Sequence, residues 1–168
     1  MTGTNGTHPA RVVVETPIGP MLVTAEGPAV TEVLLPNTGA AALGTMAGTL
    51  PSVLRRAARQ LEEYFAGKRR RFSVPLAPAG TPFQVAVWAA LDDIPYGETM
   101  TYGELAAAVG SPAAFRAVGQ ANGANPLPIF HPCHRVVAAG GRLGGYGGGL
   151  DVKRQLLALE GSPLAAAP

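Results

Sequence analysis

The chain has 168 residues, of which 47% are hydrophobic, with a single cysteine and a formal net charge of +2. This length can build one compact domain or two small ones, and the hydrophobic share is enough for a core. No stretch approaches the roughly 18 apolar residues of a membrane span, and the start lacks the apolar core of a signal peptide. We therefore expect a cytoplasmic protein without a membrane partner. A single cysteine excludes an internal disulfide and a four-cysteine zinc site, and we expect neither a metal nor a cofactor.

The charges are spread unevenly along the chain. Residues 1–79 carry eight Lys and Arg against five Asp and Glu, whereas residues 80–168 carry five against six. The second half is therefore not a basic patch. Any DNA binding there must depend on a few placed arginines and on helix N-termini that present backbone N–H groups to phosphates.

The first half predicts a small antiparallel sheet covered by one helix. Short segments in which apolar and polar residues alternate lie at residues 11–15, 21–25 and 31–35, and turns rich in Gly and Pro separate them. The Gly- and Ala-rich composition of residues 37–49 predicts a loop. Pro51 then begins a helix that ends at Gly67, with apolar residues at helical spacing. The basic run at residues 68–71 is either a solvated turn or a phosphate contact.

Proline-rich composition around residues 75–80 predicts a linker. We place a domain boundary there, between an N-terminal domain of residues 1–79 and a C-terminal domain of residues 80–168. Thr81 and Pro82 have the pattern of an N-cap followed by proline at the first helical position. The helix that they open carries an apolar stripe of Phe83, Val87, Trp88 and Leu91. We expect Trp88 in the core rather than as a platform for base stacking.

A pair of helices follows in the second half. Thr101 and Glu104 fit a capping box, and this helix ends at Gly110; Ser111-Pro112 then begins a second helix over residues 113–122. The pair has the outline of a helix-turn-helix, which is also common in proteins that never meet DNA. Together with the sheet, it predicts an α+β protein whose C-terminal part is mainly helical. Small residues in the second helix indicate that a groove wall or a neighbouring helix approaches closely.

Residues 125–137 bring together the groups most suited to chemistry. Three prolines stiffen the segment, which carries the only thiol, Cys133, beside His134 and Arg135. The thiolate is the nucleophilic form of cysteine, so a nearby imidazole that removes the proton would activate it. Neighbouring residues seldom face each other, so His134 would act either through a water molecule or through a tilted backbone, with Glu160 as a candidate for its orienting acceptor. The alternative is an inert buried thiol.

The glycine-rich loop at residues 140–149 also has two interpretations. It is either a flexible connection or a place where backbone N–H groups come close to a ligand.

The sequence resembles the O6-alkylguanine-DNA alkyltransferases. Pro132-Cys133-His134-Arg135-Val136 is similar to the PCHRV active-site motif of that family. Further segments resemble family signatures in the same order, strongly over residues 80–161 and more loosely over residues 11–75. They are Gly80-Thr81-Pro82-Phe83-Gln84, Val87-Trp88, Ile94-Pro95-Tyr96-Gly97-Glu98-Thr99, Arg116-Ala117-Val118-Gly119, Asn125-Pro126 and Gly145-Tyr146-Gly147-Gly148.

The resemblance implies a fold, a partner and a reaction. The N-terminal domain would be RNase H-like, and the C-terminal domain would hold both DNA and the active site. The partner would be double-stranded DNA bound through the minor groove by a monomer, with cooperative assembly left open. The damaged guanine would be flipped out of the stack. A methyl or other alkyl group would pass irreversibly from O6 of guanine, or from O4 of thymine, to Cys133 in a single turnover.

The same resemblance implies roles for individual residues. Cys133, His134 acting through water, and Glu160 would form the thiolate. Arg116 would enter the gap left by the flipped base, and Tyr102 would help to rotate the nucleotide and donate toward guanine N3. The remaining expected contacts are with DNA at Ala117, Gly119, Asn125 (also a hinge to the active site) and Arg135, and with the guanine edge at Val136, Tyr146 and Gly147.

The sequence departs from the family pattern at two positions near the thiol. His131 stands where an aliphatic residue is usual, so it is either a packed or surface histidine or a second imidazole near Cys133. Gly147 stands where some relatives have serine. Without an additional zinc-binding cysteine domain, a transcription-activating role is not expected.

Two other classes of protein share part of this pattern. A damage-sensing DNA-binding protein of the alkyltransferase-like kind would have the same fold but would lack Cys133. A thiol hydrolase would use Cys133 and His134 as a pair, although adjacent residues are poorly placed for direct proton transfer.

Overall fold

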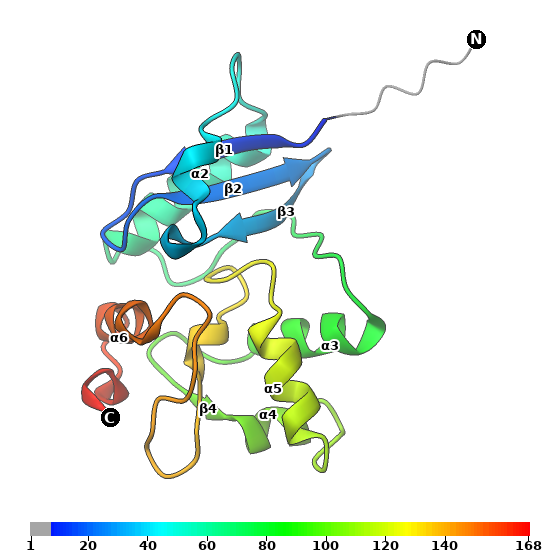
Figure 1. Cartoon of the computed structure of the whole chain (residues 1–168), viewed down its shortest axis with the longest axis vertical. Coiled ribbons are helices and arrows are strands. Elements are labelled where there is room, and N and C mark those ends of the chain that lie inside the picture. The colour runs from blue at the N-terminus through cyan, green and yellow to red at the C-terminus, as the bar shows by residue number, and fades with distance from the viewer. Residues whose placement is uncertain (1–7) are drawn as a thin grey trace.

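A three-stranded antiparallel sheet forms the start of the fold in this computed structural model, which describes residues 8–168 (Figure 1). Strand β1 covers Ala10–Val14, β2 covers Met21–Glu26 and β3 covers Ala29–Leu34. Every second residue of β1 is buried, which is the period-2 pattern that predicts a half-buried strand. The ends of all three strands lie within two residues of the predicted segments, so the expected sheet is confirmed.

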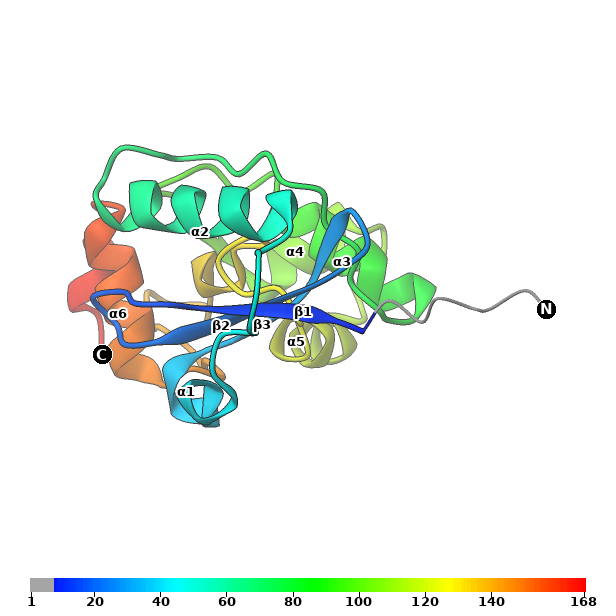
Figure 2. The ribbon, with the colours of Figure 1, turned by 90° about the horizontal axis from the view of Figure 1, so that it is seen from above.

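Helix α2, Ser52–Phe65, covers one face of this sheet as predicted. It follows Pro51 and ends before Gly67, which has a φ of 73°. The predicted loop at residues 37–49 is not wholly irregular, because it begins with a 3₁₀ turn at Pro36–Thr38 and the short helix α1, Ala40–Leu43. Figure 2 shows α1 and α2 on opposite sides of the sheet.

The outer edge of β3 is covered by two segments from further along the chain. The Val30 amide donates to the Pro75 carbonyl at 2.9 Å, and the Val33 amide donates to the Pro126 carbonyl at 2.8 Å. An uncovered strand edge would leave such groups without partners. The linker and the segment before the active site satisfy them, and this joins the second half of the chain to the sheet.

The second half is mainly helical, as expected, and the protein is therefore α+β. The predicted capping box is present at Thr101 with Glu104, and the predicted N-cap at Thr81 is part of a second capping box, with Gln84. Within residues 8–168 no helix is long and apolar enough to cross a bilayer. The elements are α3 (Pro82–Leu91), β4 (Met100–Thr101), α4 (Tyr102–Ala108), α5 (Phe115–Gly123), a 3₁₀ turn (Cys133–Arg135), β5 (Val136–Val137), α6 (Leu150–Leu159) and a final 3₁₀ turn (Pro163–Ala166).

Two predictions about the helices are wrong in detail. Helix α5 begins at Phe115 and not at residue 113, because the Ala114 amide closes a turn onto the Ser111 carbonyl at 2.8 Å. Phe83 was placed in the apolar stripe of α3, but it is 37% exposed, while the other three members of the stripe are buried. Trp88 is a core residue as expected, and its indole N–H donates to the Ala121 carbonyl at 2.7 Å.

The short parallel pair of β4 and β5 connects α4 to the active site. Met100 pairs with Val136, and Thr101 pairs with Val137. Because Thr101 is the N-cap of α4, this pairing sets the start of α4 beside the residues that follow Cys133.

The described residues build two hydrophobic cores. One lies among α3, α4, α5 and the Cys133 region. The other joins the sheet and α2 to Leu127, Ile129, Phe130 and Leu156 from the second half. Residues on both sides of position 79 therefore share one core, and the division of the chain into two domains at that position stays a prediction.

Candidate active site

Cys133 is the first residue of a 3₁₀ turn and lies against a cavity of about 410 Å³. Its side chain is buried, with 6% of the residue exposed. Tyr102, α5, and the glycine-rich loop line the cavity together with the end of β3 and the turn after it. The thiol is thus buried in the protein but borders a cavity that is partly open to solvent.

The segment of residues 125–132, which we call the active-site segment, is held rigidly behind the thiol. Asn125 fixes its two ends, because its side-chain amide donates to the His131 carbonyl at 2.8 Å and its side-chain oxygen accepts from the Leu127 amide at 2.9 Å. The Cys133 amide donates to the same His131 carbonyl at 2.7 Å. Asn125 therefore ties the end of α5 to the residues beside the thiol, and its role as a hinge stays a prediction.

Ile129, in the same segment, has a φ of 74°. A β-branched residue in this region stores about 1–3 kcal/mol of backbone strain. Ile129 is buried in the core beneath the sheet, and this packing holds it in the strained conformation.

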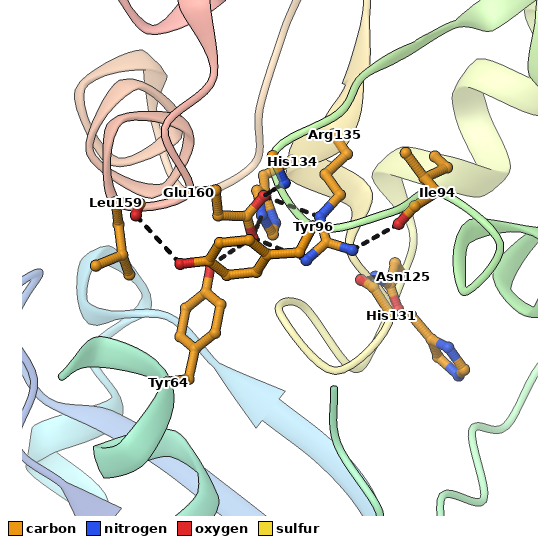
Figure 3. A network of polar contacts seen from close by, with 10 residues as sticks. Tyr64, Ile94, Tyr96, Asn125, His131, His134, Arg135, Leu159 and Glu160 are labelled. Carbon is orange, nitrogen blue, oxygen red and sulfur yellow. Dashed lines mark hydrogen bonds and ion pairs between the residues drawn. The ribbon is translucent and has the colours of Figure 1, made fainter. Parts of the chain in front are cut away.

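His134 and Glu160 form a buried pair beside Cys133 (Figure 3). His134 Nε2 and Glu160 Oε1 are 2.8 Å apart, and both side chains are 0% exposed. Burial lowers the pKa of His134 although Glu160 opposes this, so the imidazole is neutral at pH 7. Since Nε2 donates to the carboxylate, Nδ1 is the unprotonated nitrogen, and it has no hydrogen-bond partner in the part of the chain that the structure describes. His134 therefore carries one unprotonated nitrogen that no described group occupies.

Glu160 remains ionised in this buried position. Burial alone would raise its pKa, but the hydrogen bonds and charges of His134 and Arg135 outweigh that effect and lower it to about 2. Arg135 contributes two contacts, from Nε to Oε2 at 2.9 Å and from Nη2 to Oε1 at 2.9 Å.

Arg135 does not fit the expected role in DNA contact. It is only 6% exposed, and besides its two bonds to Glu160 it donates to the Ile94 carbonyl at 2.7 Å. These contacts direct the guanidinium into the protein. We therefore correct this assignment: Arg135 holds the carboxylate of Glu160.

The surroundings of the thiol act on its protonation in opposite directions. Burial raises the pKa of Cys133, while Asn125, Tyr146 and Lys153 lower it. The hydroxyl of Tyr146 is buried, and it makes no hydrogen bond within the described residues. Its closeness to Cys133 adds to burial in raising the pKa of Tyr146, so the phenol stays protonated. The buried thiol therefore needs a base, and His134 is the adjacent candidate.

Tyr102, the first residue of α4, lies in the cavity wall. Burial raises its pKa, with Cys133 as a second cause, so Tyr102 also keeps its proton. A methyl group added at Gly119 would lie 3.7 Å from the Tyr102 ring, an ordinary contact distance. Gly119 and Tyr102 therefore lie next to each other in the wall of the cavity.

Helix α5 presents one face to the cavity and another to solvent. Gly119, Asn122 and Gly123 line the cavity. Arg116 and Ala117 are exposed on the first turn, and the Arg116 guanidinium lies 5.9 Å from the centre of the Phe115 ring. Two of the expected DNA-contacting residues, Arg116 and Ala117, thus lie on the solvent side of α5, whereas Gly119 lies on the cavity side.

The glycine-rich loop supplies part of the cavity wall through Tyr146 and Gly147. Lys153 of α6 holds this loop from inside, because its ammonium group donates to the carbonyls of Val136, Leu143 and Gly145 at 2.7, 2.5 and 3.1 Å. Val136 was expected to meet the guanine edge, but it is not among the residues that line the cavity, and its carbonyl accepts from Lys153.

His131 is a packed histidine and not a second imidazole beside the thiol. It is 6% exposed, and its Nδ1 lies 2.7 Å from Asp92 Oδ1. Figure 3 shows its ring directed away from His134 and Glu160.

Several residues of the site were not expected from the sequence. The cavity wall includes Val33, Leu34, Leu35 and Thr38 from the first half, and Asn37 donates to the Gly147 carbonyl at 3.1 Å. Tyr64 of α2 donates to Glu160, and Lys153 of α6 donates to the Val136 carbonyl. Their local patterns are those of ordinary strands and helices, so only the tertiary structure reveals them.

Comparisons with known proteins identify the family. The model of the 6-O-methylguanine DNA methyltransferase DNA-binding domain matches residues 82–162, and that of the ribonuclease-like domain of the same family matches residues 11–78. The chain therefore belongs to the 6-O-methylguanine DNA methyltransferase family.

Relatives and solved structures agree with this assignment. A methylated-DNA–protein-cysteine methyltransferase of Methanosarcina acetivorans is 61% identical over 64% of this chain and 69% of its own length. The constitutive methylated-DNA–protein-cysteine methyltransferase of Bacillus subtilis is 47% identical over 87% of this chain and 92% of its own length. A crystal structure of Mycobacterium tuberculosis O6-methylguanine methyltransferase is 43% identical, with a TM-score of 0.80 over 96% of each chain. A structure of Mycobacterium tuberculosis OGT in complex with DNA is 42% identical, with a TM-score of 0.77 over 92% of this chain and 96% of that one.

Proposed function

We propose that this protein repairs DNA by transferring an alkyl group from O6 of guanine to Cys133. The observation that carries the proposal is a single thiol at the wall of a cavity of about 410 Å³, with a buried imidazole and carboxylate pair beside it. This arrangement suits a nucleophile that must be deprotonated in a dry site. The family to which the chain belongs carries the same activity in its name.

The proposed reaction is a direct displacement at the alkyl carbon. Cys133 loses its proton to Nδ1 of His134 through one water molecule, and Glu160 stabilises the resulting imidazolium. The thiolate forms a bond to the alkyl carbon while the bond from that carbon to O6 breaks. The guanine leaves with the bonding electrons and takes a proton at N3 from Tyr102, which lines the cavity and whose raised pKa keeps it protonated. Solvent returns a proton to Tyr102 and accepts one from His134.

The reaction is proposed to occur once per molecule. The product is a thioether, and water does not displace the cysteine thiolate from the alkyl carbon under mild conditions. The sequence holds no second cysteine that could accept the alkyl group. Repair of O4-alkylthymine is proposed for the same site, because it also requires displacement of the alkyl carbon from an exocyclic oxygen of the base.

DNA is the proposed partner, bound through its minor groove by a monomer. Helix α5 supports this, since Ala117 is small and exposed and Arg116 is exposed on the first turn. The damaged guanine would have to leave the stack to reach the buried thiol, and Arg116 would fill the gap.

Replacing Arg116 separates base flipping from chemistry. Arg116→Ala should slow repair of duplex DNA at least tenfold, because unstacking costs a few kcal/mol and each 1.4 kcal/mol is about tenfold. Reaction with free O6-benzylguanine, which is already outside a duplex, should stay close to that of the wild type. Arg59→Ala, on the exposed side of α2, is the control. Equal losses in both reactions of Arg116→Ala would show that the assignment is wrong.

The function itself is tested on the DNA. A duplex with one O6-methylguanine is incubated with the protein, digested to nucleosides and analysed by chromatography. Guanine should be restored by the wild type and not by Cys133→Ala, which should still bind the duplex. Restoration of guanine by Cys133→Ala would refute the proposal, and so would an unchanged adduct after incubation with the wild type.

A further inference from the structure

Tyr64 connects the first half of the chain to the catalytic carboxylate. It lies in α2, is 0% exposed, and its hydroxyl donates to Glu160 Oε1 at 2.7 Å. The two residues are 96 positions apart in the sequence. Figure 3 shows the Tyr64 ring rising from α2 toward the carboxylate.

The hydroxyl of Tyr64 shares one oxygen with the catalytic imidazole. Oε1 of Glu160 also accepts from His134 Nε2 at 2.8 Å and from Arg135 Nη2 at 2.9 Å. Three donors therefore divide the negative charge of a single oxygen. Hydrogen bonds to a carboxylate are stronger than those between neutral groups, so each donor influences how strongly the others are held.

The position of this hydroxyl is fixed by packing. The Tyr64 ring contacts three aromatic rings, with centroid distances of 5.2 Å to Phe65, 5.6 Å to Phe72 and 6.2 Å to Tyr96. A side chain held on several sides cannot turn its hydroxyl away from the carboxylate without disturbing the core.

We propose that Tyr64 is a positioning residue of the proton relay formed by Cys133, His134 and Glu160. It would orient Oε1 toward His134 and restrain the basicity of the imidazole by sharing the charge of the carboxylate. The first half of the chain would then supply part of the relay as well as a wall of the cavity. This inference rests on the proposed transfer to Cys133.

The sign of the effect follows from the contacts. Without the hydroxyl, the negative charge of Oε1 is shared only between His134 and Arg135, so the carboxylate stabilises the imidazolium more strongly. The pKa of His134 then rises. Because His134 acts as a base only while neutral, the acidic limb of the rate profile moves to higher pH.

Other charged and titratable groups face the same pair. Arg135 follows His134 in the 3₁₀ turn, Lys153 lies on α6, and Tyr96 lies on the connection between α3 and β4. Cys133 lies on the cavity side. All of these remain in place when only the Tyr64 hydroxyl is removed, so the change isolates one donor.

The test compares Tyr64→Phe with Tyr96→Phe. Tyr96 loses a hydroxyl from the same aromatic cluster, but that hydroxyl donates to the Leu159 carbonyl at 3.1 Å and not to the carboxylate. Rates of alkyl transfer from free O6-benzylguanine to the full chain are measured from pH 5 to pH 9. Tyr64→Phe should move the acidic limb up by about half a unit, a roughly threefold loss of rate on that limb. Tyr96→Phe should leave the limb where it is in the wild type.

A double-mutant cycle with Glu160→Gln keeps the test decisive if Tyr64→Phe also loosens the core. If Tyr64 acts through the carboxylate, adding Tyr64→Phe to Glu160→Gln should not move the limb further. The proposal is overturned if Tyr64→Phe keeps the wild-type limb, whatever its overall rate, if Tyr96→Phe moves it equally, or if the shift persists without the carboxylate. Failure of the proposed function is distinguishable, since the wild type would then transfer nothing.

Discussion

Glu160 is the residue at which most of the polar contacts of the site meet. A buried carboxylate is tolerated only when its charge is paired and its oxygens are hydrogen-bonded, and removing one partner costs several kcal/mol. Here Tyr64, His134 and Arg135 supply those partners. The carboxylate therefore contributes to stability and, at the same time, orients the imidazole that we propose as the base.

The stability of the protein should depend on pH through Glu160. Its pKa in the folded protein is lowered from 4.5 to about 2, so the stability that the carboxylate contributes is fully present above about pH 4.5 and is lost as the pH falls toward 2. In urea unfolding at several pH values, Glu160→Gln should be less stable at pH 7 and should converge with the wild type on acidification. Two curves that stay parallel from pH 7 to pH 3 would contradict this account.

At the scale of elements, α6 supports the glycine-rich loop through Lys153. The side chain is 0% exposed and its three donors match three carbonyls, one at β5 and two in the loop. Burial lowers the pKa of Lys153 to about 8, so at pH 7 the ammonium is present to hold them. The loop is thus fixed at its inner side, while Gly147 is exposed.

Lys153→Met should destabilise the protein while keeping the shape of the side chain. It leaves three inward-facing carbonyls without this partner, and an unsatisfied buried group costs about 1–3 kcal/mol. We expect a loss of roughly 2 kcal/mol or more in the free energy of unfolding by urea, together with slower alkyl transfer. Arg154→Met, which removes a long surface contact of 3.6 Å to Asp151, should change stability by less than about 0.5 kcal/mol. Unfolding of the two variants at the same urea concentration would show that Lys153 does not hold the loop.

The glycine-rich loop should also set which alkyl groups enter. A side chain added at Gly147 meets no atom within 4 Å, whereas one at Gly148 would strike Leu35 at 2.6 Å. Gly147→Trp should therefore fold and narrow the cavity, slowing transfer from O6-benzylguanine far more than from O6-methylguanine in the same duplex. Single-turnover rates on both substrates decide this. A common factor on both rates would show that the loop does not select by size.

Local patterns were sufficient to predict most of the elements. The alternation in β1, the N-cap at Thr81 and the capping box at Thr101 depend on neighbours in the sequence, and the structure has them as predicted. The start of α5 was misplaced because Ser111-Pro112 is compatible with either a helix start or a turn, and the Ala114 to Ser111 bond selects the turn.

At the scale of the whole molecule, the site is built between the two halves of the chain. The end of β3 walls the cavity, and Tyr64 reaches Glu160 from α2. Neither could be predicted, because a residue in a strand or in the apolar stripe of a helix gives no sign of which distant group it meets. Cys133, His134 and Glu160 could be named as candidates from the sequence, because a thiol, an imidazole and a carboxylate are the groups that the chemistry needs. The inward direction of Arg135 could be found only from the tertiary structure.

The central claim, that Cys133 accepts the alkyl group and keeps it, is tested most directly by mass spectrometry of the intact protein. The protein is incubated with an excess of duplex DNA that contains O6-methylguanine, and the reaction is followed to completion. The account predicts that the protein gains the mass of one methyl group in place of a hydrogen, that peptide mapping places it on Cys133, and that repaired DNA reaches a plateau at one equivalent. Repair that continues beyond one equivalent, or a methyl group on any other residue, would contradict it.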